Sequence, residues 1–344
     1  MASPIRVSYA FIVGTLLLVG WLNLATPFLT VLLSYFALTK LNRWEKKWLA
    51  IALFLILVAA VFYGFGFFLK RIYEQLPDIL YRLVPVANEL AGKYGVTLPF
   101  KDTATLHAFL GNEVVAQIDD VGSFAKFAAK QAVFILIGLV VAVSLFLNER
   151  LDLARDTHLV RNNLYTVSLD HIAERFRTFY RSFATVMGAQ IIISAINTSL
   201  TSIYVLSVGL PYPRMVLIAT FLCGLLPILG NLLSNTLIVG IALTVSPKLA
   251  VMSLAFLVVL HKSEYFLNSK IIGQRIQNPM WLTLLGLILG ERLMGVPGMI
   301  LAPVVLHYIK VEASKTAVAQ SPGAAGPAFG HPLPSSDEGM RGLG

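Results

Sequence analysis

The stretch that decides the fold is Trp281-Leu-Thr-Leu-Leu-Gly-Leu-Ile-Leu-Gly290-Glu-Arg-Leu-Met-Gly295-Val-Pro-Gly298-Met-Ile-Leu-Ala-Pro303-Val-Val-Leu-His-Tyr-Ile309. Its apolar run is interrupted at residues 290–292 and again at residues 295–298. A helix that crosses a bilayer needs about 20 apolar residues, and each uninterrupted part is shorter. Broken backbone at membrane depth survives only where protein or a water-filled cavity satisfies its free N–H and C=O groups. We therefore expect a re-entrant hairpin, or a pair of spans, at this point.

A second apolar stretch, residues 215–245, is broken in the same way at Pro227-Ile-Leu-Gly230-Asn231. Paired broken segments are the best sequence indication of a transporter's binding site. The sequence therefore predicts an all-α, polytopic helical membrane protein with two proline/glycine-broken re-entrant hairpins. The first group of pathway candidates lies at the two breaks: Pro227, Gly230, Asn231, Gly295 and Gly298.

The composition excludes a water-soluble protein. Of the 344 residues, 57% are hydrophobic and 13% are charged, whereas soluble domains carry about 25% charged residues. The net charge of +9 raises the question of nucleic-acid binding, but no basic, aromatic-interleaved stretch supports it. Lysine and arginine in cytoplasmic loops explain the charge better. The single cysteine, Cys223, permits neither a disulfide framework nor a cysteine metal site within the chain.

Hydropathy divides the chain into six parts. These are N-terminal transmembrane helices (1–69), an extracytoplasmic helical insert (70–127), a transmembrane helix (128–148), a cytoplasmic amphipathic segment (149–182), a transport region with both hairpins (183–315) and a disordered tail (316–344). Six full crossings are expected at 7–25, 27–41, 48–69, 131–147, 183–207 and 250–267. An amphipathic helix in the insert should kink at Pro77 and Pro85. It could lie on the membrane or pack within the insert.

The basic loops set the expected orientation. Residues 40–47, residues 149–181, Lys270 and Arg275 should be cytoplasmic, and the insert should lie outside. Each hairpin returns to its starting side, so both termini are predicted to be cytoplasmic and the protein to reside in the cell's inner (plasma) membrane. The tail is rich in Pro, Gly, Ala and Ser and should be disordered.

Polar groups inside apolar segments are the remaining pathway candidates. Glu264 lies near the end of a span, where it either faces an aqueous path as a coupling carboxylate or pairs with Lys262 or Arg275 at the interface. Glu291 and Arg292 sit at the predicted tip of the second hairpin, where they could pair with each other, bind a solute or merely reach the lipid headgroups.

A further polar stripe recurs every three or four residues along one helix face: Gln190, Ser194, Asn197 and Thr201. Such a face either lines a pathway or holds helices together by hydrogen bonds. The turn at residues 295–298 likewise forms a wall of the path or serves packing alone.

Signatures of enzymes are absent. The chain lacks a GxxxxGK[ST] phosphate loop, HExxH and GxSxG. We therefore expect no enzyme, no cofactor and no transport driven directly by ATP on this chain, which leaves passive flow or coupling to an ion gradient.

A set of short motifs then occurs in order: Gly188-Ala-Gln190, Val208-Gly-Leu-Pro211, Leu226-Pro-Ile-Leu-Gly230, Glu264-x-x-x-Asn268-Ser-Lys270-Ile-Ile-Gly273, Asn278-Pro279 and Gly295-Val-Pro-Gly298-Met-Ile-Leu-Ala-Pro303. In these motifs the chain resembles the autoinducer-2 exporter family of bacterial and archaeal membrane proteins, over about residues 24–315. One departure is Asn231, which stands where the family often has proline, so the first turn could differ in shape.

The resemblance implies a homo-oligomer, with a pentamer as the expected number, and an extracytoplasmic helical insert. Its members are linked to export of a small quorum-sensing sugar derivative and, in some cases, to sodium/proton antiport. The sequence thus predicts an integral membrane transporter, an ion- or proton-coupled exporter of small polar solutes. The alternatives are a sodium/proton antiporter and an oligomeric scaffold that moves nothing.

Overall fold

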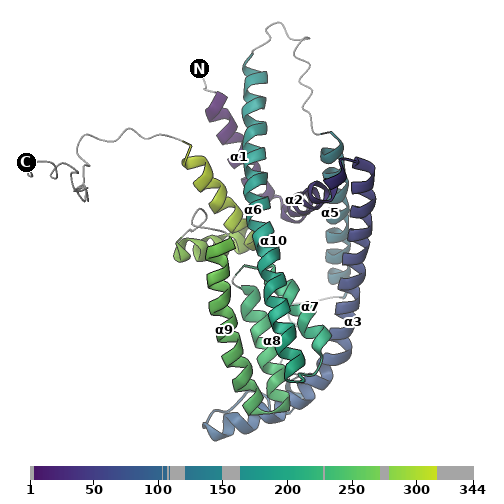
Figure 1. Ribbon diagram of the computed structural model, residues 1–344, viewed down its shortest axis with the longest axis vertical. Coiled ribbons are helices and arrows are strands. Elements are labelled where there is room, and N and C mark those ends of the chain that lie inside the picture. The colour runs from purple at the N-terminus through teal and green to yellow at the C-terminus, as the bar shows by residue number, and fades with distance from the viewer. Residues whose placement is uncertain are drawn as a thin grey trace, which may run out of the picture.

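The computed structural model describes residues 4–102, 104–106, 108, 121–148, 163–227, 229–271 and 279–315. The regular elements in this part of the chain are all helical, which confirms the all-α prediction (Figure 1). They are α1 (Pro4–Trp21), α2 (Ala25–Leu41), the short 3-10 helix η1 (Asn42–Trp44), α3 (Lys47–Lys93), α5 (Val121–Leu147), α6 (Leu164–Ser207), α7 (Pro213–Gly224), α8 (Leu229–Val245), α9 (Pro247–Ile271) and α10 (Met280–Ala313).

By length and composition, five helices in these ranges could cross a membrane: α1, α3, α5, α6 and α10, although α10 reaches this length only across a non-helical residue, Gly295. The predicted crossings at 27–41 and 250–267 correspond to α2 and α9, which are not among the five. Helix α2 has only 17 residues, and the side chains of residues 264–271 of α9 lie outside the description. The count of six crossings therefore stays a prediction. The predicted tail, residues 149–162 and the link at 272–278 also lie outside the described residues.

Two helices are longer than a bilayer is thick. Helix α6 has 44 residues, which is about 66 Å at the helical rise. The helix begins at Leu164, and the preceding Asn163 caps it, because its side chain accepts a hydrogen bond from the Thr166 amide at 2.9 Å. Helix α3 has 47 residues and continues through Pro77 and Pro85. Figure 1 shows that α3 curves at its lower end, as expected for a helix that has lost two amide donors.

The amphipathic part of α3 packs against the helical bundle. Ile79 is buried in a cluster with apolar residues of α6, α7, α8 and α9, among them Val205, Val216 and Ile241. A second cluster joins α1, α2, α6 and α10 around Phe179 and Phe183. A third joins α2, α3 and α5 around Phe54 and Phe146.

The first broken segment is a hairpin of α7 and α8. Helix α7 ends at Gly224 and α8 begins at Leu229, so the break starts before the predicted Pro227. Gly230 and Asn231 lie inside the first turn of α8 rather than in the break. The reversal is tight, since a methyl group built on Gly230 would lie 1.6 Å from the Cys223 carbonyl oxygen. Only glycine permits this approach of the two arms.

The second broken segment also folds back on itself, within α10. The prediction of a break at residues 290–292 is wrong, because the backbone stays helical through Gly290, Glu291 and Arg292. The chain reverses at Gly295, which has φ 62° and ψ −148°, a conformation that L side chains rarely adopt. We call Met280–Met294 the first arm and Val296–Ala313 the return arm. Whether either hairpin is re-entrant stays a prediction.

Candidate functional site

The return arm of α10 runs antiparallel along the first half of α6. Arg175 pairs with Glu312, the rings of Phe179 and Tyr308 lie 5.5 Å apart, and His307 Nδ1 lies 3.2 Å from Ser182 Oγ. Because the two helices are antiparallel and have the same rise per residue, each step forward along α6 matches one step backward along α10. When this register is continued, Gly295, at the turn of α10, comes level with about Ile192 of α6.

The hairpin of α7 and α8 approaches the same level of α6 from the other end. Ser194 Oγ donates to the Phe221 carbonyl at 2.7 Å. Gln190 Nε2 donates to the Gly224 carbonyl at 2.6 Å. Both acceptors belong to the last turn of α7, so the α7 end of the hairpin lies beside Gln190 and Ser194, in the second half of α6.

These bonds complete the end of α7. A helix leaves its last four carbonyls without intrahelical partners. In α7 the Leu222 carbonyl accepts from the Leu225 amide at 3.2 Å and the Cys223 carbonyl accepts from the Leu226 amide at 2.8 Å. Gln190 and Ser194 satisfy the other two carbonyls. Each of the last four carbonyls of α7 therefore has a partner, as an apolar surrounding requires.

The two hairpin turns thus come from opposite ends of α6 and reach one level of it, near residues 190–194. Figure 1 shows the upper ends of α7, α8 and α9 at a similar height along α6, close to the lower end of the return arm of α10. We define this level as the convergence zone. The sequence predicted the two breaks and the polar face of α6, but their common level follows only from the packing.

Glycine sets the spacing within the second hairpin. A methyl group on Gly298 would lie 1.9 Å from the Gly290 carbonyl oxygen, and one on Gly290 would lie 2.4 Å from the Gly298 carbonyl oxygen. The first arm and the return arm are therefore in backbone contact at this pair. Gly295 has open space around its Cβ position, so its constraint is the positive φ alone.

Beyond Ser194 the polar face of α6 holds buried oxygens that have no partner. Asn197 is 4% exposed and Thr201 is 0% exposed. The side-chain oxygens Asn197 Oδ1, Thr198 Oγ1 and Thr201 Oγ1 are buried and make no hydrogen bond in the described part of the chain. A buried polar group of this kind calls for an explanation, and unplaced water or ions are the common ones.

Helix α9 adds a carboxylate-bearing residue at the same height. Tyr204 of α6 hydrogen-bonds Ser253 of α9 at 2.8 Å and stacks on Phe256 at 4.1 Å between ring centroids. Helix α9 runs antiparallel to α6 from that contact (Figure 1). By equal rise, the backbone of Glu264 comes level with about Ile193, in the convergence zone. The side chain of Glu264 lies outside the description.

Glu291 and Arg292 lie in the first arm, before the turn. Both are exposed, and no ion pair joins them in the part of the chain that the structure describes. Both side chains are thus exposed, whereas the unpartnered oxygens of α6 are buried.

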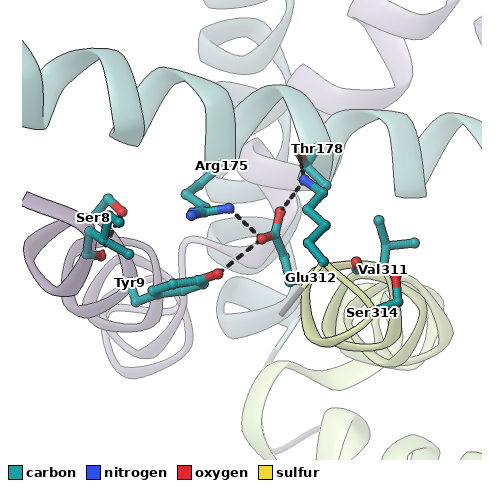
Figure 2. A network of polar contacts seen from close by, with 9 residues as sticks. Ser8, Tyr9, Arg175, Thr178, Val311, Glu312 and Ser314 are labelled. Carbon is teal, nitrogen blue, oxygen red and sulfur yellow. Dashed lines mark hydrogen bonds and ion pairs between the residues drawn. The ribbon is translucent and has the colours of Figure 1, made fainter. Parts of the chain in front are cut away.

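A charged network that the sequence did not suggest fixes the end of the return arm (Figure 2). Glu312 is 5% exposed and accepts from Arg175, from the Tyr9 hydroxyl at 3.1 Å and from Lys315 Nζ at 3.0 Å. Lys315 Nζ also donates to Thr178 Oγ1 at 3.2 Å. The network ties α10 to α1 and α6. No local pattern could have revealed it, because Arg175 and Glu312 are 137 positions apart.

The two hairpins converge on a polar helix face, and comparison with known proteins places the chain in a family of membrane transporters. The sequence profile described as "AI-2E family transporter" matches residues 7–316. The chain belongs to this family. The chain is thus a membrane transporter, and its described part contains several apolar helices.

A curated relative supports the same assignment. The "Putative transport protein YdbI" of Bacillus subtilis (strain 168) is 28% identical over 158 residues, which cover 45% of this chain and 45% of the relative. The aligned part thus spans less than half the length of that relative. No solved structure matches the chain.

Proposed function

We propose that this protein moves small polar solutes through the membrane along the polar face of α6, with export coupled to an ion or proton gradient. The observation that carries the proposal is the group of unpartnered oxygens at Asn197, Thr198 and Thr201. A polar group without a partner in an apolar interior costs about 1–3 kcal/mol in proteins. Water or a hydroxyl-bearing solute in a path would remove that cost.

If the polar face of α6 served only to pack helices, each of its polar side chains should hydrogen-bond a neighbouring helix. Gln190 and Ser194 act as packing groups, since they bond the end of α7. Asn197 and Thr201 do not, because their oxygens bond no other helix in the described structure. The polar face of α6 thus divides into a part that supports the first hairpin and a part that is available to a solute.

We assign the coupling role to Glu264. Its backbone comes level with both hairpin turns, and a carboxylate at that depth is costly unless it faces water, a cation or a partner. Pro227, Gly230 and Asn231 of the first hairpin and Gly295 and Gly298 of the second would shape the path, and Glu291 and Arg292 would lie toward its entrance.

Reconstitution into liposomes tests the proposal. Asn197→Leu and Thr201→Val remove the unpartnered oxygens and keep approximate volume. If the oxygens serve a path, transport of small hydroxylated solutes should fall at least about tenfold, while the melting temperature holds or rises because an unsatisfied polar group is gone. Ser199→Ala is the matched control, since Ser199 is exposed and bonds only its own helix at Ala195. Full transport by Asn197→Leu, or a fall in melting temperature that matches the loss of transport, would contradict the proposal.

Sodium/proton antiport is the second candidate, and one observation favours it. The unpartnered oxygens of Asn197, Thr198 and Thr201 lie in the same stretch of the bundle as Glu264. Neutral and carboxylate oxygens are hard ligands of the kind that bind alkali cations. A sodium gradient imposed on proteoliposomes should then drive proton flux, read by an internal pH dye, and Glu264→Gln should abolish that flux while the oligomer stays assembled. A scaffold without transport would tolerate Glu264→Gln in every assay.

The orientation and assembly belong to the same proposal. We place Arg43 and both termini in the cytoplasm, Lys93 outside and the protein in the inner membrane as a homo-oligomer, with a pentamer expected. Arg43 and Lys93 are both exposed, so single cysteines at these positions on a Cys223→Ser background can be labelled on intact cells. An impermeant reagent should reach Lys93→Cys and miss Arg43→Cys. The reverse pattern would overturn the orientation, and a monomer by native mass spectrometry in lipid would overturn the assembly.

A further inference from the structure

A cationic cavity lies where the amphipathic part of α3 meets the start of α7. Its volume is about 180 Å³, and it is lined by Arg71 and Gln75 of α3 and by Tyr212, Pro213, Arg214 and Met215. A larger groove of about 520 Å³ adjoins it at Arg71 and is lined by Tyr63, Gly66, Phe67, Lys70, Arg71 and Glu74. Both lie on the face of α3 next to the point where its apolar stretch ends, after Leu69.

The charges in the two hollows do not balance. Among the lining residues, Lys70, Arg71 and Arg214 accompany one carboxylate, Glu74. That carboxylate is shared, since it lies 3.1 Å from Arg71 and 3.8 Å from Lys70. The neighbouring Asp78, which Tyr212 contacts, is paired with Arg82. Arg214 is exposed and has no carboxylate within ion-pair distance among the described residues. The site therefore carries an excess of positive charge that an anion would neutralise.

A side-chain amide, Gln75, is part of the cavity lining. The Gln75 Oε1 atom is buried and has no hydrogen-bond partner in the described structure. A ligand that suits both features is negatively charged and carries a hydroxyl or ammonium donor beside the charge. Tyr212 frames the opening in a fixed position, because its hydroxyl donates to Asp78.

The position of the cavity relative to the bilayer indicates the class of ligand. The apolar run of α3 ends at Leu69, and Lys70 and Arg71 follow directly, so the site lies at the headgroup level if α3 spans the bilayer. Exposed apolar residues of α3 such as Phe62, Phe65 and Leu69 lie on the bilayer side of it. We propose that this cavity binds the phosphate of an anionic lipid headgroup, with Arg71 and Arg214 on the phosphate and Gln75 on a headgroup hydroxyl.

Such a lipid would link α3 to the start of the first hairpin, because Arg214 is the second residue of α7. The bound headgroup would hold the amphipathic part of α3 against the turn between α6 and α7. The proposal is independent of the solute path, since none of the cavity residues lies in the convergence zone.

The test uses the full chain in detergent with phosphatidylglycerol or phosphatidylcholine and native mass spectrometry to count retained lipids. Wild type should retain phosphatidylglycerol in preference to phosphatidylcholine, and Arg71→Gln or Arg214→Gln should weaken its affinity about tenfold, the effect of losing one charge-assisted contact. Lys248→Gln is the matched control, because Lys248 is an exposed cation near the start of α9 that does not line the cavity. Gln75→Glu should weaken binding while every cation is kept.

Two further outcomes decide the source of the phosphate and the fate of the proposal. In the first, inorganic phosphate or glycerol 3-phosphate raises the melting temperature as much as phosphatidylglycerol does, and the increase is absent in Arg214→Gln. That result would assign the site to a soluble anion and overturn the lipid assignment. Equal phosphatidylglycerol retention by wild type, Arg214→Gln and Gln75→Glu, each with an unchanged gel-filtration profile, would overturn the site itself.

Discussion

The backbone contact between the arms of the second hairpin makes Gly298→Ala the most demanding test of the fold. A methyl group at residue 298 would lie 1.9 Å from the Gly290 carbonyl oxygen and 2.7 Å from Met294 Cβ. Real Cβ atoms essentially never come closer than 3.0 Å to a neighbour. The nearest atoms belong to the backbone and cannot rotate away, so the two arms must move apart by roughly 1 Å.

The expected loss of stability follows from two opposing effects. Overpacking of a well-packed contact costs about 1–3 kcal/mol, and backbone neighbours place this site at about 3. Alanine is favoured over glycine within a helix by up to about 1 kcal/mol, which offsets part of the cost. The net expectation is a loss of about 2 kcal/mol in the free energy of unfolding.

Unfolding in mixed detergent micelles, followed by circular dichroism, measures this loss. The matched control is Gly240→Ala in α8, where nothing lies within 4 Å of the new methyl group, so that variant should gain about 0.5–1 kcal/mol. The two variants should therefore differ by about 3 kcal/mol. Equal stability of Gly298→Ala and wild type would show that the arms do not touch at Gly290, and the assignment of the turn to Gly295 would fall with it.

Three further predictions concern other contacts. Gln190→Leu leaves the Gly224 carbonyl unpaired and should lower the free energy of unfolding by about 1–3 kcal/mol. Thr236→Val removes only a bond within its own helix and should change that free energy little. Equal effects of the two variants in a thermal melt would contradict the role of Gln190 at the end of α7. Glu312→Gln removes the charge that pairs with Arg175 and should lower the free energy of unfolding by about 3–5 kcal/mol. An unchanged thermal melt would show that this network does not stabilise the fold. The third prediction concerns acid, because the Tyr212 hydroxyl, and to a smaller extent Arg82, hold the pKa of the Asp78 carboxyl below its usual range. The contact between Tyr212 and Asp78 therefore stabilises the fold at neutral pH and is lost as the pH falls through that lowered pKa. Tyr212→Phe should reduce the drop in melting temperature between pH 6 and pH 3, and an unchanged drop would refute the contact.

The sequence by itself determined the class of the protein and the sites of its breaks. Low charge and long apolar runs require a membrane, and glycine and proline within two of these runs predict interrupted helices there. The polar period of Gln190, Ser194, Asn197 and Thr201 likewise follows from helix geometry alone. These features are local, so a single pass along the chain finds them.

The exact turns could be placed only within a few residues. The break predicted at Gly290 proved helical, because the pair Gly290 and Gly298 serves close packing of two arms rather than a turn. Gly295 alone takes the reversing conformation. Glycine has both uses, and sequence does not distinguish them, since the distinction depends on what lies opposite.

Only the tertiary structure decided which polar groups are satisfied. Gln190 and Asn197 look alike in sequence, yet the first bonds the end of α7 and the second has no partner for its oxygen in the described structure. The Glu312 network and the cation-lined cavity at Arg71 and Arg214 also join segments more than a hundred residues apart. The physical reason is that hydrogen bonds and ion pairs depend on distances of a few ångströms between helices, and only the packing of the whole bundle sets those distances.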